Sequence, residues 1–278
     1  MGLVALALPA VVFLSAGGAS AATTVVVTPA NEQGWSDSPP LADTRPGGAV
    51  NFVADTTAPA GDAALQLTTN LTTSAKAQYM HEAGIDLSEV TELSFYTKQN
   101  SATFVEGAPS YQLPICLTGF NGAACNPGEA GTTGPTSFTT LVYEPYQGGS
   151  GPVIPNTWQQ WDVDAGLFWS TRTVVCSNGV IAGGAGGPAI HTLTQVKAAC
   201  PEAFVLSFGV NIGTFNPGYD VETDLFNFNG TTYNFELTNE PSSKDDCKKG
   251  GWMGLTDQNG DSFKNQGQCV SWTNGRGQ

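Results

Sequence analysis

The sequence predicts an all-β fold, namely a two-sheet β-sandwich with one short helix and a small C-terminal tail. The clearest strand spans 204–212, where five bulky apolar residues alternate with smaller or more polar ones: Phe204, Leu206, Phe208, Val210 and Ile212. This period of two predicts a strand with one buried face. In 157–164, Trp161 and Val163 fall on the face opposite to Trp158, so this stretch is predicted to be a second strand.

The other strands are short and are separated by turn signals about every 8 to 15 residues, which favours a sandwich over an α/β arrangement. In chain order, strands are expected at 23–28, 50–54, 63–69, 92–98, 111–117, 138–146, 157–164, 204–212, 225–228 and 232–237. Because Pro114 cannot donate a backbone hydrogen bond, we expect its strand at the edge of a sheet.

Two local signals mark the connections near the C-terminal end of the sandwich. Asn229-Gly230 predicts a two-residue hairpin. Thr192 and Gln195 have the spacing of a capping box, which predicts a helix start. Pro201 follows shortly after and is expected to end this helix.

The N-terminal segment, residues 1–21, reads as a signal peptide. An apolar run from Leu3 to Leu14 is followed by the cleavage signal Ala19-Ser20-Ala21, although no Lys or Arg precedes Arg45. The run is shorter than the roughly 20 apolar residues of a membrane-spanning helix. We therefore expect a secreted, extracellular protein with no membrane span.

The six cysteines fall into three pairs that are close in sequence, and none has the C-x-x-C spacing of a zinc or redox site. From this spacing we predict three structural disulfides, which fits an exported protein. The predicted pairs are Cys116 with Cys125, Cys176 with Cys200, and Cys247 with Cys269.

The charge is strongly acidic and unevenly distributed. The chain has 10 Lys and Arg against 24 Asp and Glu, a net charge of −14, while residues 239–278 carry five acids and five bases. The whole net charge therefore belongs to the sandwich. Such a surface repels a phosphate backbone, so we expect no nucleic-acid partner.

The order of elements, with the W-x-x-W-D-V strand at 158–163, a short capped helix and the D-L-F-N-F hairpin strand at 224–228, resembles the jelly-roll sandwiches of carbohydrate-binding modules and concanavalin-like domains. The resemblance covers 23–238 and implies a jelly-roll-like sandwich domain at 22–238. It also implies a polysaccharide or cell-surface glycan as partner.

The tail, 239–278, is predicted to be a small module of two short helices stapled by one disulfide. Ser243 and Asn265 are the expected helix caps, and Gly250 fits the end of the first helix. The segments C-K-K-G-G-W at 247–252 and F-K-N-Q-G-Q-C-V-S at 263–271 resemble a C-terminal segment of secreted bacterial proteins whose function is not assigned.

Strand parity and side-chain type together select a candidate glycan site on an outer sheet face. Flat aromatic rings stack on sugars, and amides hydrogen-bond their hydroxyl groups. The candidate residues are Trp158, Gln160, Tyr96, Tyr143 and Asn211. Packing of Trp158 in the core is the alternative.

Three acids alternate along one strand, at Asp220, Glu222 and Asp224. On one strand face, neighbouring carboxylates are about 6.5 to 7 Å apart. Three interpretations stay open: solvated acids, a structural Ca²⁺ site, or a catalytic carboxylate pair. Apart from this Ca²⁺, no cofactor is expected.

Three functional hypotheses follow. The first is a secreted, non-catalytic binding or surface-associated protein with a glycan as ligand. The second is a glycan-active hydrolase or lyase that uses acids such as Glu144, Glu222 or Asp224. The third is a structural component of a cell envelope or spore surface. The presence of only two histidines and the absence of a G-x-S-x-G motif argue against nucleophilic catalysis.

Overall fold

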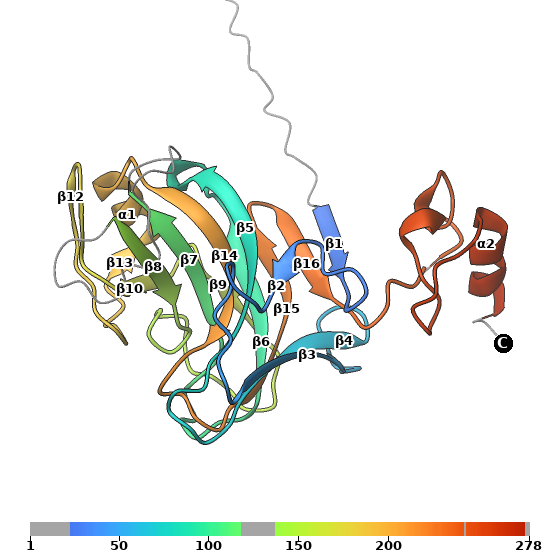
Figure 1. Ribbon diagram of the computed structural model, residues 1–278, viewed down its shortest axis with the longest axis horizontal. Helices are drawn as coiled ribbons and strands as arrows, with labels where there is room; N and C mark the ends of the chain where they lie inside the picture. Colours follow the sequence, from blue (N-terminus) through green and yellow to red (C-terminus); the bar gives the residue numbers. More distant parts are fainter. Residues whose placement is uncertain (1–22, 118–136, 242, 276–278) are drawn as a thin grey trace, which may run out of the picture.

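The computed structural model describes residues 23–117, 137–241 and 243–275, and in these ranges the chain forms a two-sheet β-sandwich (Figure 1). The predicted signal peptide and Cys125 lie outside the described residues. The predicted fold class, an all-β sandwich with few short helices, is confirmed.

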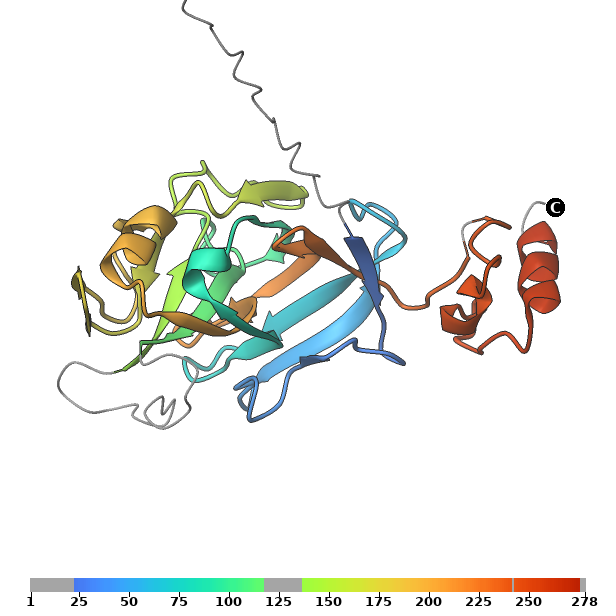
Figure 2. The ribbon, with the colours of Figure 1, turned by 90° about the horizontal axis from the view of Figure 1, so that it is seen from above.

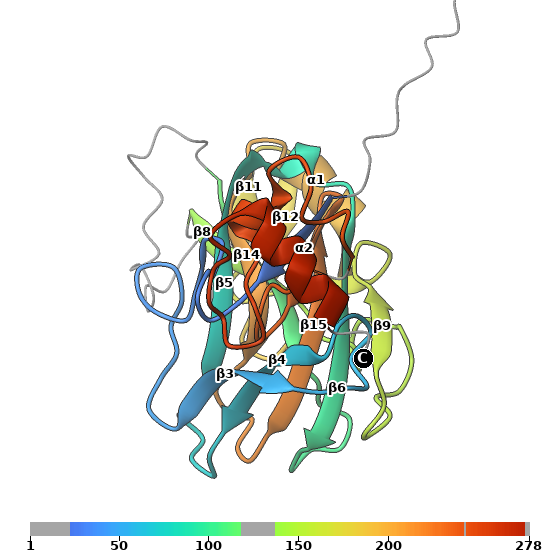
Figure 3. The same cartoon turned by 90° about the vertical axis from the view of Figure 1, so that its right-hand side faces the viewer.

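We name the two seven-stranded sheets after their central strands. The β15 sheet comprises β1 (Thr23–Val27), β16 (Thr231–Phe235), β15 (Asp220–Phe228), β4 (Ala63–Thr69), β3 (Gly48–Ala54), β6 (Leu93–Ser101) and β9 (Gln159–Asp162). The β14 sheet runs in the order β13 (His191–Thr192), β10 (Leu167–Ser170), β8 (Phe138–Tyr143), β7 (Ser110–Cys116), β14 (Phe204–Ile212), β5 (Ala77–Asp86) and β2 (Trp35–Ser36). Figure 3 shows the two layers from the side, with β5 and β14 in one and β6 and β15 in the other.

Smaller elements lie at the two ends of the molecule. The helix α1 (Leu193–Ala199) and the hairpin of β11 (Val174–Cys176) and β12 (Gly179–Ile181) lie at the end opposite to the tail (Figure 2). Between β5 and β6 the chain forms the 3₁₀ turn η1 (Leu87–Glu89), and the tail contains η2 (Gly251–Gly254) and α2 (Gln266–Gly275).

Aromatic packing joins the sheets. The ring of Trp35 on β2 stacks on Tyr79 at a centroid distance of 5.4 Å, and it meets Phe226 and Phe235 of the other sheet edge-on at 5.3 and 5.2 Å. All four rings are buried. Edge-to-face and offset contacts at these distances stabilise a fold beyond the burial of apolar area. The packing of Trp35 therefore holds the two-residue edge strand β2 against both sheets.

The central strand β14 contains a bulge that changes the predicted pattern. Against β7, the step from Val205 to Gly209 is one residue longer than the paired step from Ile115 to Gln112, so β14 has one extra residue there. Val205 lies in the core, while Phe204 and Leu206 line a hollow on the outer face. The predicted single buried face of 204–212 is correct only from Phe208 onward. One extra residue in a strand reverses the alternation on one side of it.

The prediction that Pro114 marks an edge strand is wrong, because β7 lies between β8 and β14. The ladder between β7 and β14 is interrupted between Val205 and Gly209 of β14, opposite Pro114. Proline is tolerated inside a sheet where a bulge removes the need for its amide.

The hairpin and helix signals are confirmed. Asn229 and Gly230 both have positive φ, 52° and 77°, as a tight turn between β15 and β16 requires. At α1, the Thr192 hydroxyl accepts from the Gln195 amide at 3.1 Å, and the Gln195 side chain accepts from the Thr192 amide at 2.9 Å. The helix ends at Ala199, two residues before the proline.

The tail forms its own small core, in which Cys247, Phe263 and Cys269 are buried. The Cys247–Cys269 disulfide is confirmed, and the Asn265 side chain caps α2 by accepting from the Gln268 amide at 2.9 Å. The first predicted helix is wrong, because 243–254 forms turns and the 3₁₀ segment η2 instead.

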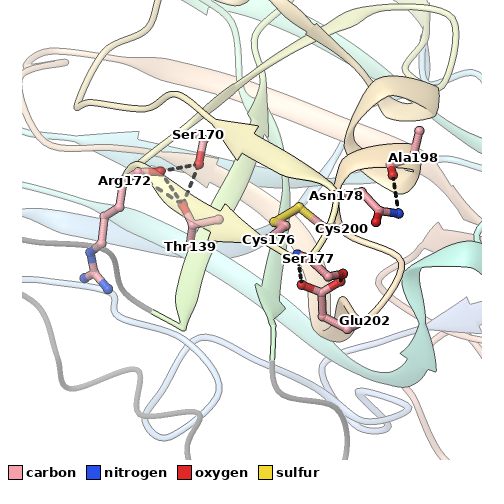
Figure 4. The surroundings of a disulfide bond; sticks show 9 residues. All are labelled: Thr139, Ser170, Arg172, Cys176, Ser177, Asn178, Ala198, Cys200 and Glu202. Carbon is pink, nitrogen blue, oxygen red and sulfur yellow. Dashed lines mark hydrogen bonds between the residues drawn. A yellow bond between two sulfur atoms is a disulfide. The ribbon is translucent and has the colours of Figure 1, made fainter.

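Of the other predicted disulfides, Cys176–Cys200 is confirmed and ties β11 to the end of α1 (Figure 4). Cys116 is disulfide-bonded, and its predicted partner lies outside the described residues. No helix in the described ranges is long and apolar enough to cross a bilayer.

We expect the Cys176→Ala/Cys200→Ala variant to unfold with a free energy about 2 to 4 kcal/mol below that of the wild type, because the bridge closes a loop of 24 residues. Urea unfolding followed by near-ultraviolet circular dichroism measures this. The matched variant Cys247→Ala/Cys269→Ala should leave the transition of the sandwich unchanged, since that bridge lies in the separate tail core. An equal loss in both variants would mean that the tail is part of the main core.

Candidate functional site

Three of the predicted site residues lie together on the outer face of the β15 sheet. Trp158, just before β9, is half-buried outside the core, and Trp161 on the opposite face is buried. The Tyr96 hydroxyl donates to Gln160 Oε1 at 3.0 Å across the β6–β9 pair. Strand parity therefore placed these three side chains on the correct face.

This face is occupied by its own polar network. The Lys98 ammonium contacts Asp55 at 2.5 Å and Glu222 at 3.3 Å, and it lies 5.7 Å from the Trp158 ring centroid. The Trp158 indole nitrogen donates to the same Asp55 oxygen at 3.0 Å. Although burial raises the pKa of the Asp55 carboxyl, the hydrogen bonds from Lys98 and Thr57 lower it well below its usual range. The network leaves Trp158 little freedom to meet a ligand.

The acidic row of β15 is neither solvated nor arranged as a metal site. Asp220 accepts from Gln66 at 2.8 Å, and Glu222 accepts from Asn100 at 2.7 Å and pairs with Lys98. Among the described residues there is no group of three or more His, Cys, Asp or Glu that could hold a metal ion. The interpretation of three solvated acids is wrong, because Glu222 and Asp224 are buried.

Asp224 is the most unusual of these acids. Its side chain is fully buried, one oxygen accepts from the Phe235 amide at 2.9 Å, and Oδ2 has no hydrogen-bond partner among the described residues. Burial raises the pKa of this carboxyl to about 7. The fold therefore favours the protonated form, in which Oδ2 carries the proton.

Tyr143 is wrong as a surface residue, because its side chain is 0% exposed in the core. Its ring is closed in by two glycines, since a Cβ at Gly148 or Gly166 would come within 2.3 Å of it. Its hydroxyl is paired with Ser150 at 2.6 Å. Tyr143 lies on the inner face of β8 with Leu141, and its ring centroid is 6.3 Å from that of Phe95 on the opposite sheet, so its assignment to the outer face was wrong.

Asn211 lies on the other sheet, apart from Trp158. It lines one of two hollows on the outer face of the β14 sheet, with volumes of about 780 and 390 Å³. Both hollows are lined by Arg45, Lys76, Gln112 and Thr171, so they form one groove, which we call the β14 groove. It crosses β5, β14, β7, β8 and β10.

The floor of the β14 groove is a chain of amide and hydroxyl side chains. Gln78 donates to Gln112 at 2.7 Å, and Gln112 and Asn211 each reach the Ser110 hydroxyl at 3.5 Å. Asn211 is 6% exposed. These hydrogen bonds fix the orientation of the amide side chains on three strands, β5, β7 and β14, before any ligand is bound.

Aromatic rings line the smaller hollow of the groove. Trp169 on β10 is half-buried and donates its indole N–H to Glu144 at 2.9 Å. Tyr146 is 38% exposed and Phe215 is 78% exposed, and all three side chains line the smaller hollow. Exposed rings beside oriented amides are the composition expected of a sugar-binding groove.

Glu144 is the only one of the three proposed catalytic acids in this groove. Burial raises the pKa of its carboxyl, against hydrogen bonds from Trp169 and Gln147. Glu222 and Asp224 face outward from the opposite sheet, and packed sheets alone are about 10 Å apart. A glycosidase needs two carboxylates about 5 to 9.5 Å apart, so Glu144 does not form a catalytic pair with either of the other two acids.

Most residues of the β14 groove were missed by reasoning from the sequence. Gln78 lies on β5, which was not predicted, and Trp169 lies on a four-residue strand without visible alternation. Gln112 is the exception, because strand 111–117 was predicted and its parity places this glutamine opposite the buried Leu113. That signal was available and was not used.

Comparison with known proteins gives only distant similarity. No protein-family model and no curated protein sequence matches the chain. Among solved structures it is similar to an arabinose-bound α-L-arabinofuranosidase, at 10% identity and a TM-score of 0.37 over 73% of this chain and 24% of that one. It thus spans about a quarter of that enzyme's length.

Two further similar structures are small modules. One is a xylan-binding domain from Paenibacillus barcinonensis, at 14% identity and a TM-score of 0.33 over 73% of this chain and 86% of that one. The other is a family 11 carbohydrate-binding module from Clostridium thermocellum in complex with a mixed-linked tetrasaccharide, at 12% identity and a TM-score of 0.33 over 68% of this chain and 86% of that one. Similarity at this level assigns no residue role.

The buried Asp224 predicts a specific pH dependence of stability. Because its folded pKa is raised from 3.8 to about 7, its contribution to stability is complete below pH 4 and is lost as the pH rises through 7. Three units correspond to about 4 kcal/mol at most. We expect Asp224→Asn, which cannot ionise, to lose about 2 to 4 kcal/mol less unfolding free energy than the wild type between pH 5 and pH 8.

Urea unfolding at the two pH values measures this difference. The control is Asp220→Asn, which removes another carboxyl of the same strand and leaves Asp224 in place, so it should retain the pH-dependent loss that Asp224 causes. Equal pH dependence in the wild type and Asp224→Asn would show that the Asp224 carboxyl is not protonated in the fold.

Proposed function

We propose that this protein is a secreted, non-catalytic glycan-binding protein and that the β14 groove holds the saccharide. The observation that carries the proposal is the composition of the groove, with oriented amides on its floor and half-buried or exposed rings at one end. A groove that crosses five strands suits an extended chain better than a compact ligand. Its larger hollow, about 780 Å³, lies in the usual range for ligand sites, about 300 to 1,000 Å³.

The outer face of the β15 sheet is the competing site, and its chemistry supports it less. Its cation, acids and indole nitrogen already bind one another through Asp55 and Lys98. A ligand there would have to replace several charge-assisted hydrogen bonds, which are stronger than those that a sugar hydroxyl offers. In the β14 groove, by contrast, the amide side chains line an open hollow that a ligand can enter.

The hydrolase or lyase hypothesis receives less support than binding, since the three acids named for it are divided between the two outer faces. Binding needs only the amides and rings of one groove. We also propose that 239–278 is a separate module joined to the sandwich, a boundary that rests on its own disulfide and small core.

The test compares two tryptophans in matched settings. Trp169 and Trp158 are both half-buried, lie on the outer faces of different sheets, and donate an indole N–H to a carboxylate. If the β14 groove is the site, Trp169→Ala should weaken binding to a polysaccharide found on a glycan array by about tenfold or more, or about 1.4 kcal/mol. Trp158→Ala should bind as the wild type does.

Isothermal titration of each folded variant, with its melting temperature checked, gives the affinities. Loss of binding in Trp158→Ala alone would move the site to the β15 sheet. If no glycan on the array binds the wild type, the proposed function is wrong. Turnover of any bound polysaccharide would instead support the enzyme hypothesis.

A further inference from the structure

The few basic residues of the acidic sandwich are concentrated in the β14 groove. Within 23–238 the sequence contains nineteen acids and only five bases. These bases are Arg45, Lys76, Lys98, Arg172 and Lys197. Three of the five, the two arginines and Lys76, line the larger hollow, where the acids are Asp43 and Glu82. The larger hollow therefore contains one more base than acid, in a molecule that is strongly negative elsewhere.

Two of the three bases share one acid. Arg45 and Lys76 contact the same Asp43 oxygen, at 2.5 and 3.3 Å. Although burial raises the pKa of Asp43, the hydrogen bond from Arg45 and the charge of Lys76 lower it, so this acid stays ionised. The single negative charge of Asp43 is shared by the two positive charges of Arg45 and Lys76, so the three residues together have a net charge of +1.

Arg172 has no acid at all. No carboxylate of the described residues lies within 4 Å of its guanidinium, and its buried Nη1 has no hydrogen-bond partner there. The group is held 5.2 Å from the Phe138 ring centroid. Glu82 lies on β5, four strand spacings from β10, which Arg172 follows, or roughly 19 Å away. A buried donor nitrogen is normally hydrogen-bonded, so Nη1 of Arg172 lacks its partner within the described chain.

The position of Arg172 is fixed by its backbone. Its amide donates to the Thr139 hydroxyl at 3.1 Å, and its carbonyl accepts from the Ser170 hydroxyl at 2.7 Å, while the side chain points away from the disulfide (Figure 4). A Cβ on Gly183 would lie 2.3 Å from the same carbonyl, so the 183 segment packs directly against it. The guanidinium is therefore presented by a rigid loop.

We propose that the β14 groove selects glycans that carry a uronic-acid carboxylate and that this carboxylate pairs with the Arg172 guanidinium. The planar guanidinium matches a carboxylate in two parallel hydrogen bonds. The inference rests on the proposed glycan-binding function and refines its ligand class. It names Arg172 as the residue that determines specificity.

The net charge limits how many carboxylates the ligand carries. Outside the groove, the sandwich repels a dense polyanion, and this repulsion is screened only beyond about 8 Å at physiological salt. One unpaired arginine and one surplus charge at Arg45 and Lys76 can accept an isolated carboxylate. The ligand class is therefore a mainly neutral polysaccharide with widely spaced uronic-acid groups, and not a polyuronate.

The test uses neutral oligosaccharides of several backbones, each in a form with one uronic-acid substituent and in the matching carboxyl-reduced form. Isothermal titration with the full chain at 150 mM salt should give about tenfold tighter binding of the uronate form for at least one backbone. Arg172→Gln should remove this preference, so that the uronate and reduced forms bind this variant with equal affinity. Arg172→Lys should restore only part of it, because an ammonium cannot make two parallel hydrogen bonds.

The control is Lys197→Gln, which removes a positive charge outside the groove, where Lys197 bonds the Val90 carbonyl. It should keep the preference for the uronate form. Equal affinity for both forms, or a preference that survives in Arg172→Gln, would overturn the inference while leaving glycan binding intact. Tighter binding of a sulfated form of the same backbone, or of polygalacturonate, would overturn the ligand class. Failure of every oligosaccharide to bind would overturn the proposed function itself.

Discussion

The bulge of β14 is the constraint on which both the core and the groove depend. The residue that β14 has in excess of β7 between Val205 and Gly209 lets Val205 and Phe208 both enter the core. The same displacement turns Phe204 and Leu206 to the outer face, where they form the apolar part of the groove. It also opens the ladder opposite Pro114, so that a proline fits in the middle of a sheet. One irregularity in the central strand thus supplies the surface on which a ligand can lie.

Much of the fold could be predicted from local patterns. The limits of Ala63–Thr69 and Phe204–Ile212 agree with the structure, and so do the Asn229-Gly230 turn and the capping box at Thr192. These features depend on side-chain alternation, φ angles and hydrogen bonds between near neighbours. The bulge depends on pairing with β5 and β7, which are distant in sequence. Strand β5 itself begins with four consecutive buried residues, so no alternation marks it.

The candidate site was harder to predict than the fold. Parity correctly placed Trp158, Gln160 and Tyr96 away from the core, but parity does not show that Asp55 reaches over this face and binds the indole. Of the five residues predicted for the glycan site, Asn211 is the one that lies in the groove. Arg172 carried no signal in the sequence, because an arginine in a loop is expected to be solvated. Its significance comes from the absence of an acid around it in the folded chain that the structure describes.

The β14 sheet ends on both sides in strands of only two residues, β13 and β2. An exposed edge strand presents unpaired amides and carbonyls to which a neighbouring molecule can add its own strand. Here each edge offers too short a template for such growth, although the sheet is seven strands wide. Together with mutual repulsion between acidic copies, these short edges oppose pairing of this sheet with that of a neighbouring molecule at high protein concentration.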